Sequence, residues 1–170
     1  HASARSGMAL RPDFSQDELD DDRVQTGNEE PADRSADRVR EVALRQLVHD
    51  GAVDRQGRFW AGTLGDGSNN NLYRLDPDGS LHTMETNLAI SNGIGWSPDH
   101  TTMYFTDSPR KQIYAYDFDP GSGELCNRRV WVDSGEEPGV PDGLCVDSEG
   151  CVWSARWDGW KVTRYDPAGK

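Results

Sequence analysis

One segment of this chain recurs, and the recurrence limits the folds that the chain can adopt. Residues 54–61 (DRQGRFWA) match residues 147–154 (DSEGCVWS), and a weaker copy begins at Ser97. Within the copies, Asp54, Asp99 and Asp147 are spaced by 45 and 48 residues. A period in the forties that alternates turns with short strands is typical of the blades of a β-propeller.

Short β-type runs lie between turn signals throughout residues 47–170. They predict strands of about five residues each, at residues 58–62, 71–75, 102–106, 112–116, 129–132, 151–154 and 161–165. The region suffices for about three blades, whereas propellers have roughly four to eight. The sequence therefore predicts an all-β, incomplete β-propeller. Such a chain is a fragment, completes its ring by oligomerising, or stays open; the final turn signal at 166–170 favours the fragment.

Residues 1–46 have a different composition from the rest. They contain one aromatic residue, Phe14, and eleven acidic residues against seven arginines. Such a segment buries too little apolar surface to offset the entropy of ordering it. We expect a disordered or weakly helical acidic tail over residues 1–46, with a short helix near residues 35–47, and a partial propeller over residues 47–170.

The net charge of −12 narrows the classes of partner. Nucleic-acid binding needs clustered Lys and Arg, and a membrane span needs about 20 consecutive apolar residues. The chain has neither feature. Its three cysteines, Cys126, Cys145 and Cys151, fit neither a disulfide framework nor a C-x-x-C metal motif. We therefore expect no nucleic-acid or membrane partner, and a cytoplasmic protein with reduced thiols.

Four motifs of the second region resemble a known family. They are VDRQGRFWAGT (53–63), ISNGIGWSPD (90–99), YFTDS (104–108) and GVPDGL (139–144). In order and spacing they are similar to the gluconolactonase, regucalcin (senescence marker protein) and luciferin-regenerating-enzyme family. The resemblance implies a six-bladed propeller, of which this chain carries about three blades. It also implies hydrolysis of a sugar lactone with one divalent metal ion, usually Ca²⁺, with Zn²⁺ or Mn²⁺ as alternatives.

The resemblance implies roles for two polar residues. Asn92 and Asp142 match metal ligands of the family, and Asp142 also matches its catalytic acid/base. Both side chains carry oxygen atoms, which Ca²⁺ prefers as ligands, and we expect each residue to lie in a loop. Without the resemblance, Ser-Asn-Gly and Pro-Asp-Gly are better explained as plain turns.

Two more residues are candidates for substrate binding, where the chain departs from the family pattern. The family's Arg-x-Asn-Asp-Gly motif matches residues 47–51, with Leu47 in place of the Arg and His49 in place of the Asn. Asp50 is retained. His49 is either a partner for a sugar hydroxyl or an exposed loop histidine. The family's first-blade Glu ligand has no counterpart in residues 1–46, which predicts weaker metal binding.

Aromatic residues near the end of the chain have two interpretations. Arg156 and Trp157 follow a predicted strand and are candidates for lining the central channel, whereas Trp157 and Trp160 fit packing between blades equally well. The sequence as a whole predicts metal-dependent hydrolysis of a sugar lactone, impaired by the missing Glu and the missing blades. The alternatives are a non-catalytic binding module and an inactive truncated fragment.

Overall fold

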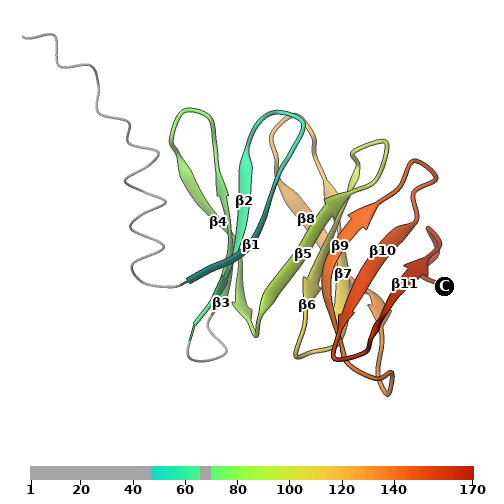
Figure 1. Cartoon of the computed structure of the whole chain (residues 1–170). Coiled ribbons are helices and arrows are strands. Elements are labelled where there is room, and N and C mark those ends of the chain that lie inside the picture. The colour runs from blue at the N-terminus through green and yellow to red at the C-terminus, as the bar shows by residue number, and fades with distance from the viewer. Residues whose placement is uncertain (1–46, 66–69) are drawn as a thin grey trace, which may run out of the picture. The chain divides into compact units, whose positions relative to one another are not determined.

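The structure, a computed structural model, describes residues 47–65 and 70–170, which form eleven strands and no helix. The predicted acidic tail, residues 1–46, lies outside the described residues. The strands form three antiparallel sheets (Figure 1), so the predicted all-β class is confirmed. The described residues form no helix that is long and apolar enough to cross a membrane.

Each sheet is a meander of strands in chain order, and we call the sheets blades 1, 2 and 3. Blade 1 consists of β1 (Leu47–Val53), β2 (Phe59–Leu64), β3 (Asn70–Leu75) and β4 (Leu81–Leu88). Blade 2 consists of β5 (Ser91–Trp96), β6 (Thr102–Asp107), β7 (Gln112–Phe118) and β8 (Leu125–Asp133). Blade 3 consists of β9 (Val140–Val146), β10 (Val152–Trp157) and β11 (Lys161–Tyr165).

The first strands of the three blades lie side by side. β1 contacts β5, and β5 contacts β9, so these are the inner strands from which the blades extend (Figure 1). This is the arrangement of a β-propeller. The described blades do not close into a ring, which confirms the prediction of an incomplete propeller with about three blades.

Two of the repeated aspartate segments, at Asp54 and Asp147, form one kind of turn, which Asp166 also begins. At Asp54, Asp147 and Asp166 the backbone N–H donates to the carbonyl oxygen four residues later, over 2.8–3.0 Å. The Oδ1 atom of each aspartate accepts hydrogen bonds from the backbone N–H groups two and four residues later. The third residue after each aspartate is a glycine with φ of 79–81°, a conformation that glycine adopts readily. This turn therefore recurs in blades 1 and 3, whereas the weaker copy at Asp99 in blade 2 forms a different turn, in which the Ser97 N–H donates to the carbonyl oxygen of Thr102 over 2.9 Å.

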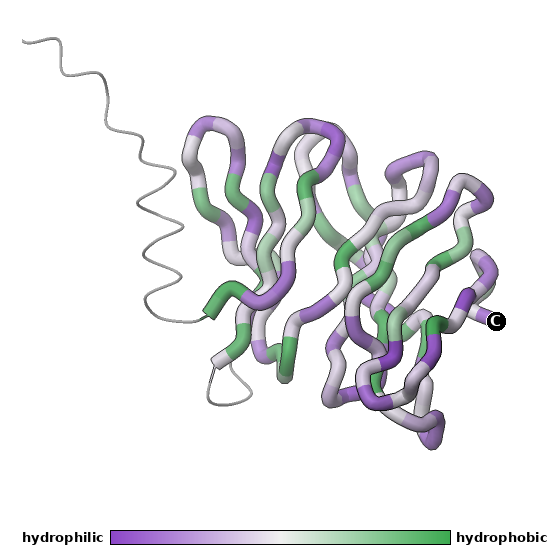
Figure 2. Tube along the Cα trace, viewed as in Figure 1, coloured by the Kyte–Doolittle hydropathy of each residue, from purple (hydrophilic) through white to green (hydrophobic). Residues whose placement is uncertain are grey.

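Apolar and aromatic side chains pack between adjacent blades. Trp60 of blade 1 is fully buried. Its ring centroid lies 6.0 Å from that of Trp96 in β5 and 5.9 Å from that of Phe118 in β7, and both of these strands belong to blade 2. Between blades 2 and 3, the ring of Trp131 lies 4.6 Å from Tyr104 and 6.1 Å from Tyr165. Figure 2 shows hydrophobic positions along strands of all three blades. Each interface between blades is thus a small core.

One face of blade 3 is exposed within the described residues. Trp60 and Trp153 occupy equivalent positions, and each indole Nε1 donates to the aspartate six residues earlier, over 3.0 and 2.9 Å. Trp60 is covered by blade 2 and is 0% exposed, whereas Trp153 is 41% exposed. The difference in exposure between these two equivalent tryptophans therefore distinguishes a blade face that another blade covers from one that no described residue covers.

Candidate functional site

The four predicted site residues lie on the three inner strands. His49 and Asp50 belong to β1, Asn92 to β5 and Asp142 to β9. The prediction that Asn92 and Asp142 lie in loops is wrong. Asn92 is paired with Thr106 of β6, and Asp142 lies between two paired positions of β9. The pairing of these backbones with neighbouring strands also excludes plain turns at both positions.

Each inner strand has a bulge where these residues lie. The residues without a partner of their own on the next strand are His49 in β1, Gly93 in β5 and one of the pair Asp142–Gly143 in β9. Bulges bend a strand and change the direction of its side chains, and they are common next to active sites. The three blades therefore carry the same irregularity at the level of the candidate site.

Gly93 brings β5 against β9. A Cβ atom at this position would lie 2.5 Å from the backbone nitrogen of Leu144 and 2.8 Å from the carbonyl oxygen of Asp142. Because these are backbone atoms, they cannot move aside as a flexible side chain would, and only glycine fits. Asn92 thus lies one residue from the contact with Asp142, although 50 positions separate the two in the chain.

Both candidate metal ligands have oxygen atoms that no protein group occupies. The Asn92 side chain is buried, and its Nδ2 donates to Oγ of Ser108 over 3.2 Å. This bond orients the amide, and Oδ1 accepts no hydrogen bond within residues 47–65 and 70–170. Over the same residues the half-buried Asp142 carboxylate has no hydrogen-bond or ion-pair partner. An amide oxygen and a carboxylate of this kind fit a hard cation such as Ca²⁺.

His49 connects β1 to β5 beside Asn92. Its Nδ1 lies 3.0 Å from the carbonyl oxygen of Ser91. A carbonyl oxygen only accepts hydrogen bonds, so Nδ1 carries the proton, and Nε2 of the neutral ring is an acceptor. The residue as a whole is exposed. The neighbouring Asp50 accepts a 2.7 Å hydrogen bond from the backbone of Gly51.

Asp107, the last residue of β6, and Ser108, which follows it, support the Asn92 segment. The buried carboxylate of Asp107 accepts hydrogen bonds from the backbone N–H groups of Ala89 (3.1 Å) and Ile90 (3.3 Å), which lead into β5. Ser108 holds the Asn92 amide. The sequence analysis did not single out Ser108; its only signal was its place at the end of the YFTDS motif.

A cavity of about 400 Å³ opens beside Asp142. Its other walls come from β10, the β10–β11 hairpin and the start of β11, and include Arg156, Trp157, Asp158, Trp160 and Lys161. Sequence reasoning considered Arg156 and Trp157 for the channel and both tryptophans for packing. The structure places these residues in one cavity with Asp142, and Lys161 and Asp158 were not anticipated.

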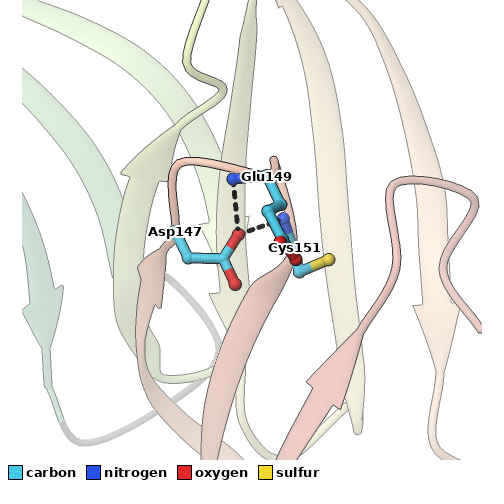
Figure 3. A group of neighbouring side chains, drawn as sticks. All are labelled: Asp147, Glu149 and Cys151. Atoms are coloured by element: carbon cyan, nitrogen blue, oxygen red, sulfur yellow. Dashed lines mark hydrogen bonds between the residues drawn. The ribbon is translucent and has the colours of Figure 1, made fainter.

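A second group of polar atoms lies in the turn between β9 and β10. Ligand atoms of Asp147, Glu149 and Cys151 lie within 4.8 Å of one another (Figure 3). A hydrogen bond from Trp153, with others from the turn backbone and Arg164, lowers the pKa of Asp147 to about 2. Arg164 also pairs with Glu149. Because Arg164 pairs with both carboxylates and the turn backbone occupies Oδ1 of Asp147, these groups serve to stabilise the turn.

The fold and the site define the class of this protein: it is an open β-propeller that carries polar side chains on its adjoining inner strands. Residues 25–170 match the family described as the SMP-30/Gluconolactonase/LRE-like region. The chain belongs to this family, which confirms the resemblance of the four motifs. The match begins before Leu47 and so includes residues outside the described part of the chain.

Individual relatives agree with the family assignment. A pentonolactonase of Haloferax volcanii is 39% identical over 149 residues, which cover 87% of this chain and 51% of the relative. A solved luciferin-regenerating enzyme has a TM-score of 0.70 at 30% identity and covers 76% of this chain and 45% of its own. A calcium-binding regucalcin of Agrobacterium tumefaciens has a TM-score of 0.69 at 31% identity, covering 72% of this chain and 43% of its own. The chain spans about half the length of the curated relatives it matches.

Proposed function

We propose that this chain carries the site for metal-dependent hydrolysis of a sugar lactone. The observation that supports the proposal best is the contact between β5 and β9 at Gly93. It puts Gly93, the residue after Asn92, against the backbone of Asp142, and both candidate ligands have oxygen atoms that no described protein group occupies. The 39% identity to a pentonolactonase supports lactones as the substrate class. We therefore propose a sugar lactone as the substrate of the whole protein.

The residues that would hold the metal ion are Asn92, through Oδ1, and Asp142, through its carboxylate. Ca²⁺ prefers such oxygen ligands and is the proposed ion, with Zn²⁺ or Mn²⁺ as alternatives; the regucalcin among the solved relatives is described as calcium-binding. A bound cation of this kind supplies a Lewis acid that stabilises negative charge on the lactone carbonyl oxygen. With only two protein ligands in the described residues, we expect dissociation constants near 10⁻⁴–10⁻³ M.

The Asp142 carboxylate is the proposed acid/base. It accepts a proton from a water molecule as the water oxygen bonds to the lactone carbonyl carbon. The bond between this carbon and the ring oxygen then breaks, and the protonated Asp142 returns its proton to the departing oxygen. The product is the open-chain hydroxy acid. Asp142 suits this role because no protein group within the described residues occupies its oxygens.

His49 and Asp50 are the proposed substrate-binding residues. The bond to Ser91 leaves the Nε2 of His49 as an acceptor for a sugar hydroxyl. Asp50 accepts one backbone hydrogen bond through Oδ1, and its other oxygen can accept from a second hydroxyl. Both residues lie on β1, next to β5, so their positions suit contacts with the part of the sugar farthest from Asp142.

Calorimetric titration and a pH-indicator assay of lactone opening test the proposal together. We expect Ca²⁺ or Mn²⁺ to bind the chain, and Asp142→Asn and Asn92→Ala to weaken binding. Asp142→Asn should also remove the metal-dependent acceleration of lactone opening. Asp158→Asn is the matched control, because Asp158 lines the same cavity but lies off the inner strands. Equal rates for the unmodified chain and Asp142→Asn would contradict the proposed role of Asp142.

A non-catalytic sugar-binding module is the second candidate. Leu47 favours it, because it stands where the family pattern has an arginine and is 63% exposed, with no charge to offer a substrate. In that case the chain would bind a sugar lactone without opening it faster than buffer does. We also propose a cytoplasmic location, where Cys126, Cys145 and Cys151 would stay reduced.

A further inference from the structure

His49 is the one histidine among the described residues that lies on an inner strand. It belongs to β1, whereas His82 belongs to β4 and His100 to the segment between β5 and β6. His49 has no partner of its own on β2, so the bulge of β1 falls at its side chain. The bulges of β5 and β9 lie at or beside Asn92 and Asp142. His49 therefore has the same place on its strand as the two candidate metal ligands have on theirs.

Two close contacts bring β5 near the blades on both sides of it. A Cβ atom at Gly62 of blade 1 would overlap the Cβ atom of Ser91. A Cβ atom at Gly93 would lie 2.5 Å from the backbone nitrogen of Leu144 in β9. Ser91 and Gly93 are the two chain neighbours of Asn92. Blades 1 and 3 thus both approach β5 most closely where Asn92 lies.

The hydrogen bond made by His49 leaves its imidazole in a form that can bind a metal ion. Nδ1 donates to the carbonyl oxygen of Ser91 over 3.0 Å, so the unprotonated nitrogen of the neutral ring is Nε2. Metal-binding histidines almost always donate their other ring N–H to a backbone carbonyl, a carboxylate or water, which fixes the orientation of the ring. Within the described residues, Nε2 of His49 has no hydrogen-bond partner. The ring therefore offers a free lone pair beside the segment that carries Asn92.

Nitrogen and oxygen ligands favour different cations. Ca²⁺ binds oxygen atoms, whereas imidazole nitrogen suits Zn²⁺. Catalytic zinc sites typically have three protein ligands and keep a further position for water or substrate. His49, Asn92 and Asp142 together would supply one nitrogen ligand and two oxygen ligands. The donor set therefore fits Zn²⁺ better than the two oxygen ligands alone do.

We infer that Nε2 of His49 is a third protein ligand for Zn²⁺ at the proposed metal site and contributes nothing to the binding of Ca²⁺. The family pattern has Asn at this position, which offers no imidazole nitrogen, so this ligand is a property of the present chain. With Ca²⁺ in the site, Nε2 stays available to a sugar hydroxyl. The inference rests on the proposed function, because it adds a ligand to the metal site proposed there.

Calorimetric titration of the full chain with Zn²⁺ or Ca²⁺ alone, without a lactone, tests the inference. His49→Asn should weaken Zn²⁺ binding about tenfold or more, because loss of a partner that only orients a ligand already costs that much. It should leave Ca²⁺ binding unchanged. His100→Asn is the matched control, since His100 lies off the inner strands and its φ of 58° is a conformation that Asn tolerates. Equal Zn²⁺ affinities of the unmodified chain and His49→Asn, or no Zn²⁺ binding at all, would overturn the inference.

The ¹⁵N signals of the imidazole rings show where Zn²⁺ binds in the unmodified chain. We expect Zn²⁺ to shift the Nε2 signal of His49 while Nδ1 stays protonated, and Ca²⁺ to leave both signals in place. His49→Asn and His100→Asn assign the signals to their residues. Zn²⁺ binding that leaves the Nε2 signal of His49 in place would overturn the inference, and this readout does not require any substituted chain to fold.

The inference and the proposed function fail separately. Zn²⁺ that binds through Nε2 of His49 without accelerating lactone opening would contradict the proposed function and keep the nitrogen ligand. Zn²⁺-dependent lactone opening in a chain whose His49 signals do not move would do the reverse.

Discussion

Gly93 determines how closely blades 2 and 3 approach each other at the candidate site. Its hydrogen atom occupies a place where a methyl group would overlap two backbone atoms of β9, the nitrogen of Leu144 and the carbonyl oxygen of Asp142. The contact cannot be relieved by rotating a side chain, so a larger residue has to push two strands apart. The glycine therefore maintains both the packing of the blades and the proximity of Asn92 to Asp142.

Gly93→Ala should destabilise the chain by about 1–3 kcal/mol, because overpacking of a close contact costs that much. It should also weaken metal binding, because the strands that carry Asn92 and Asp142 would separate. Urea denaturation and calorimetric titration measure the two effects. Gly143→Ala is the matched control on β9, since a Cβ there meets no atom within 4 Å. Similar unfolding midpoints for both variants would show that the close contact is not important.

Individual site residues were predictable from the sequence only through motifs. Asn92 and Asp142 were identified by resemblance, because their local sequences are also those of common turns. The hydrogen bond from His49 to Ser91 joins residues 42 positions apart on different blades. No local pattern encodes such a contact, since it depends on how the inner strands adjoin.

Among the strands, those away from the inner edge of each blade were the most predictable. The predicted runs at 102–106, 112–116 and 161–165 correspond to β6, β7 and β11. The inner strands were missed, because β5 (SNGIGW) and β9 (VPDGLCV) contain the Gly, Pro, Asn and Asp that usually mark turns. Strand propensity describes a half-buried pleated surface. Inner strands instead need small residues for close approach and polar residues for the candidate site. Strand propensity therefore does not predict the strands that carry the site.

The repeated turn makes a prediction about acid stability. The pKa of Asp147 is about 2 in the folded chain, below its ordinary value of 3.8, chiefly because of the hydrogen bond from Trp153. A carboxyl with a lowered folded pKa contributes stability above its unfolded pKa and loses it as the pH falls through the folded pKa. This contribution should therefore be complete above about pH 4 and disappear toward pH 2.

Asp147→Asn should lower the unfolding midpoint in urea at pH 6 and reduce the loss of stability between pH 4 and pH 2. Urea titrations at several pH values measure both effects. Glu136→Gln is the control, because Glu136 is exposed and has no hydrogen-bond partner within the described residues. If Asp147→Asn and the unmodified chain lose stability in parallel below pH 4, the turn network does not control acid unfolding.

At the scale of the whole molecule, buried arginines connect one blade to the next. Arg58 of blade 1 bonds to Asp54 over 2.6 Å and also donates to the carbonyl oxygens of Pro120 (2.8 Å) and Gly121 (3.1 Å) in blade 2. Burial alone would raise the pKa of Asp54, but the bonds from Trp60 and Arg58 outweigh it and lower the pKa. The pair therefore stays ionised between the blades.

Arg58→Met should destabilise the chain by about 3–5 kcal/mol, because it leaves the buried Asp54 carboxylate without its cation. Arg129→Met is the matched control. Arg129 pairs with Asp117 over 2.7 Å, but both side chains are 48% exposed, and such pairs contribute about 0–1 kcal/mol. Urea denaturation of both variants measures the difference. Equal losses of stability would mean that the contact between blades does not depend on Arg58.

The open face of blade 3 should make the chain associate with itself. Trp153 and Val162 are 41% and 60% exposed, and one edge of β11 is unpaired within the described residues. Exposed apolar faces and free strand edges promote association. Sedimentation velocity should therefore show a weight-average mass that rises with concentration, and Val162→Lys should lower it by placing a charge on this face. Val130→Lys, at a 50% exposed position of blade 2, is the control. If Val130→Lys reduced association as much as Val162→Lys, the contact would not involve the face of blade 3.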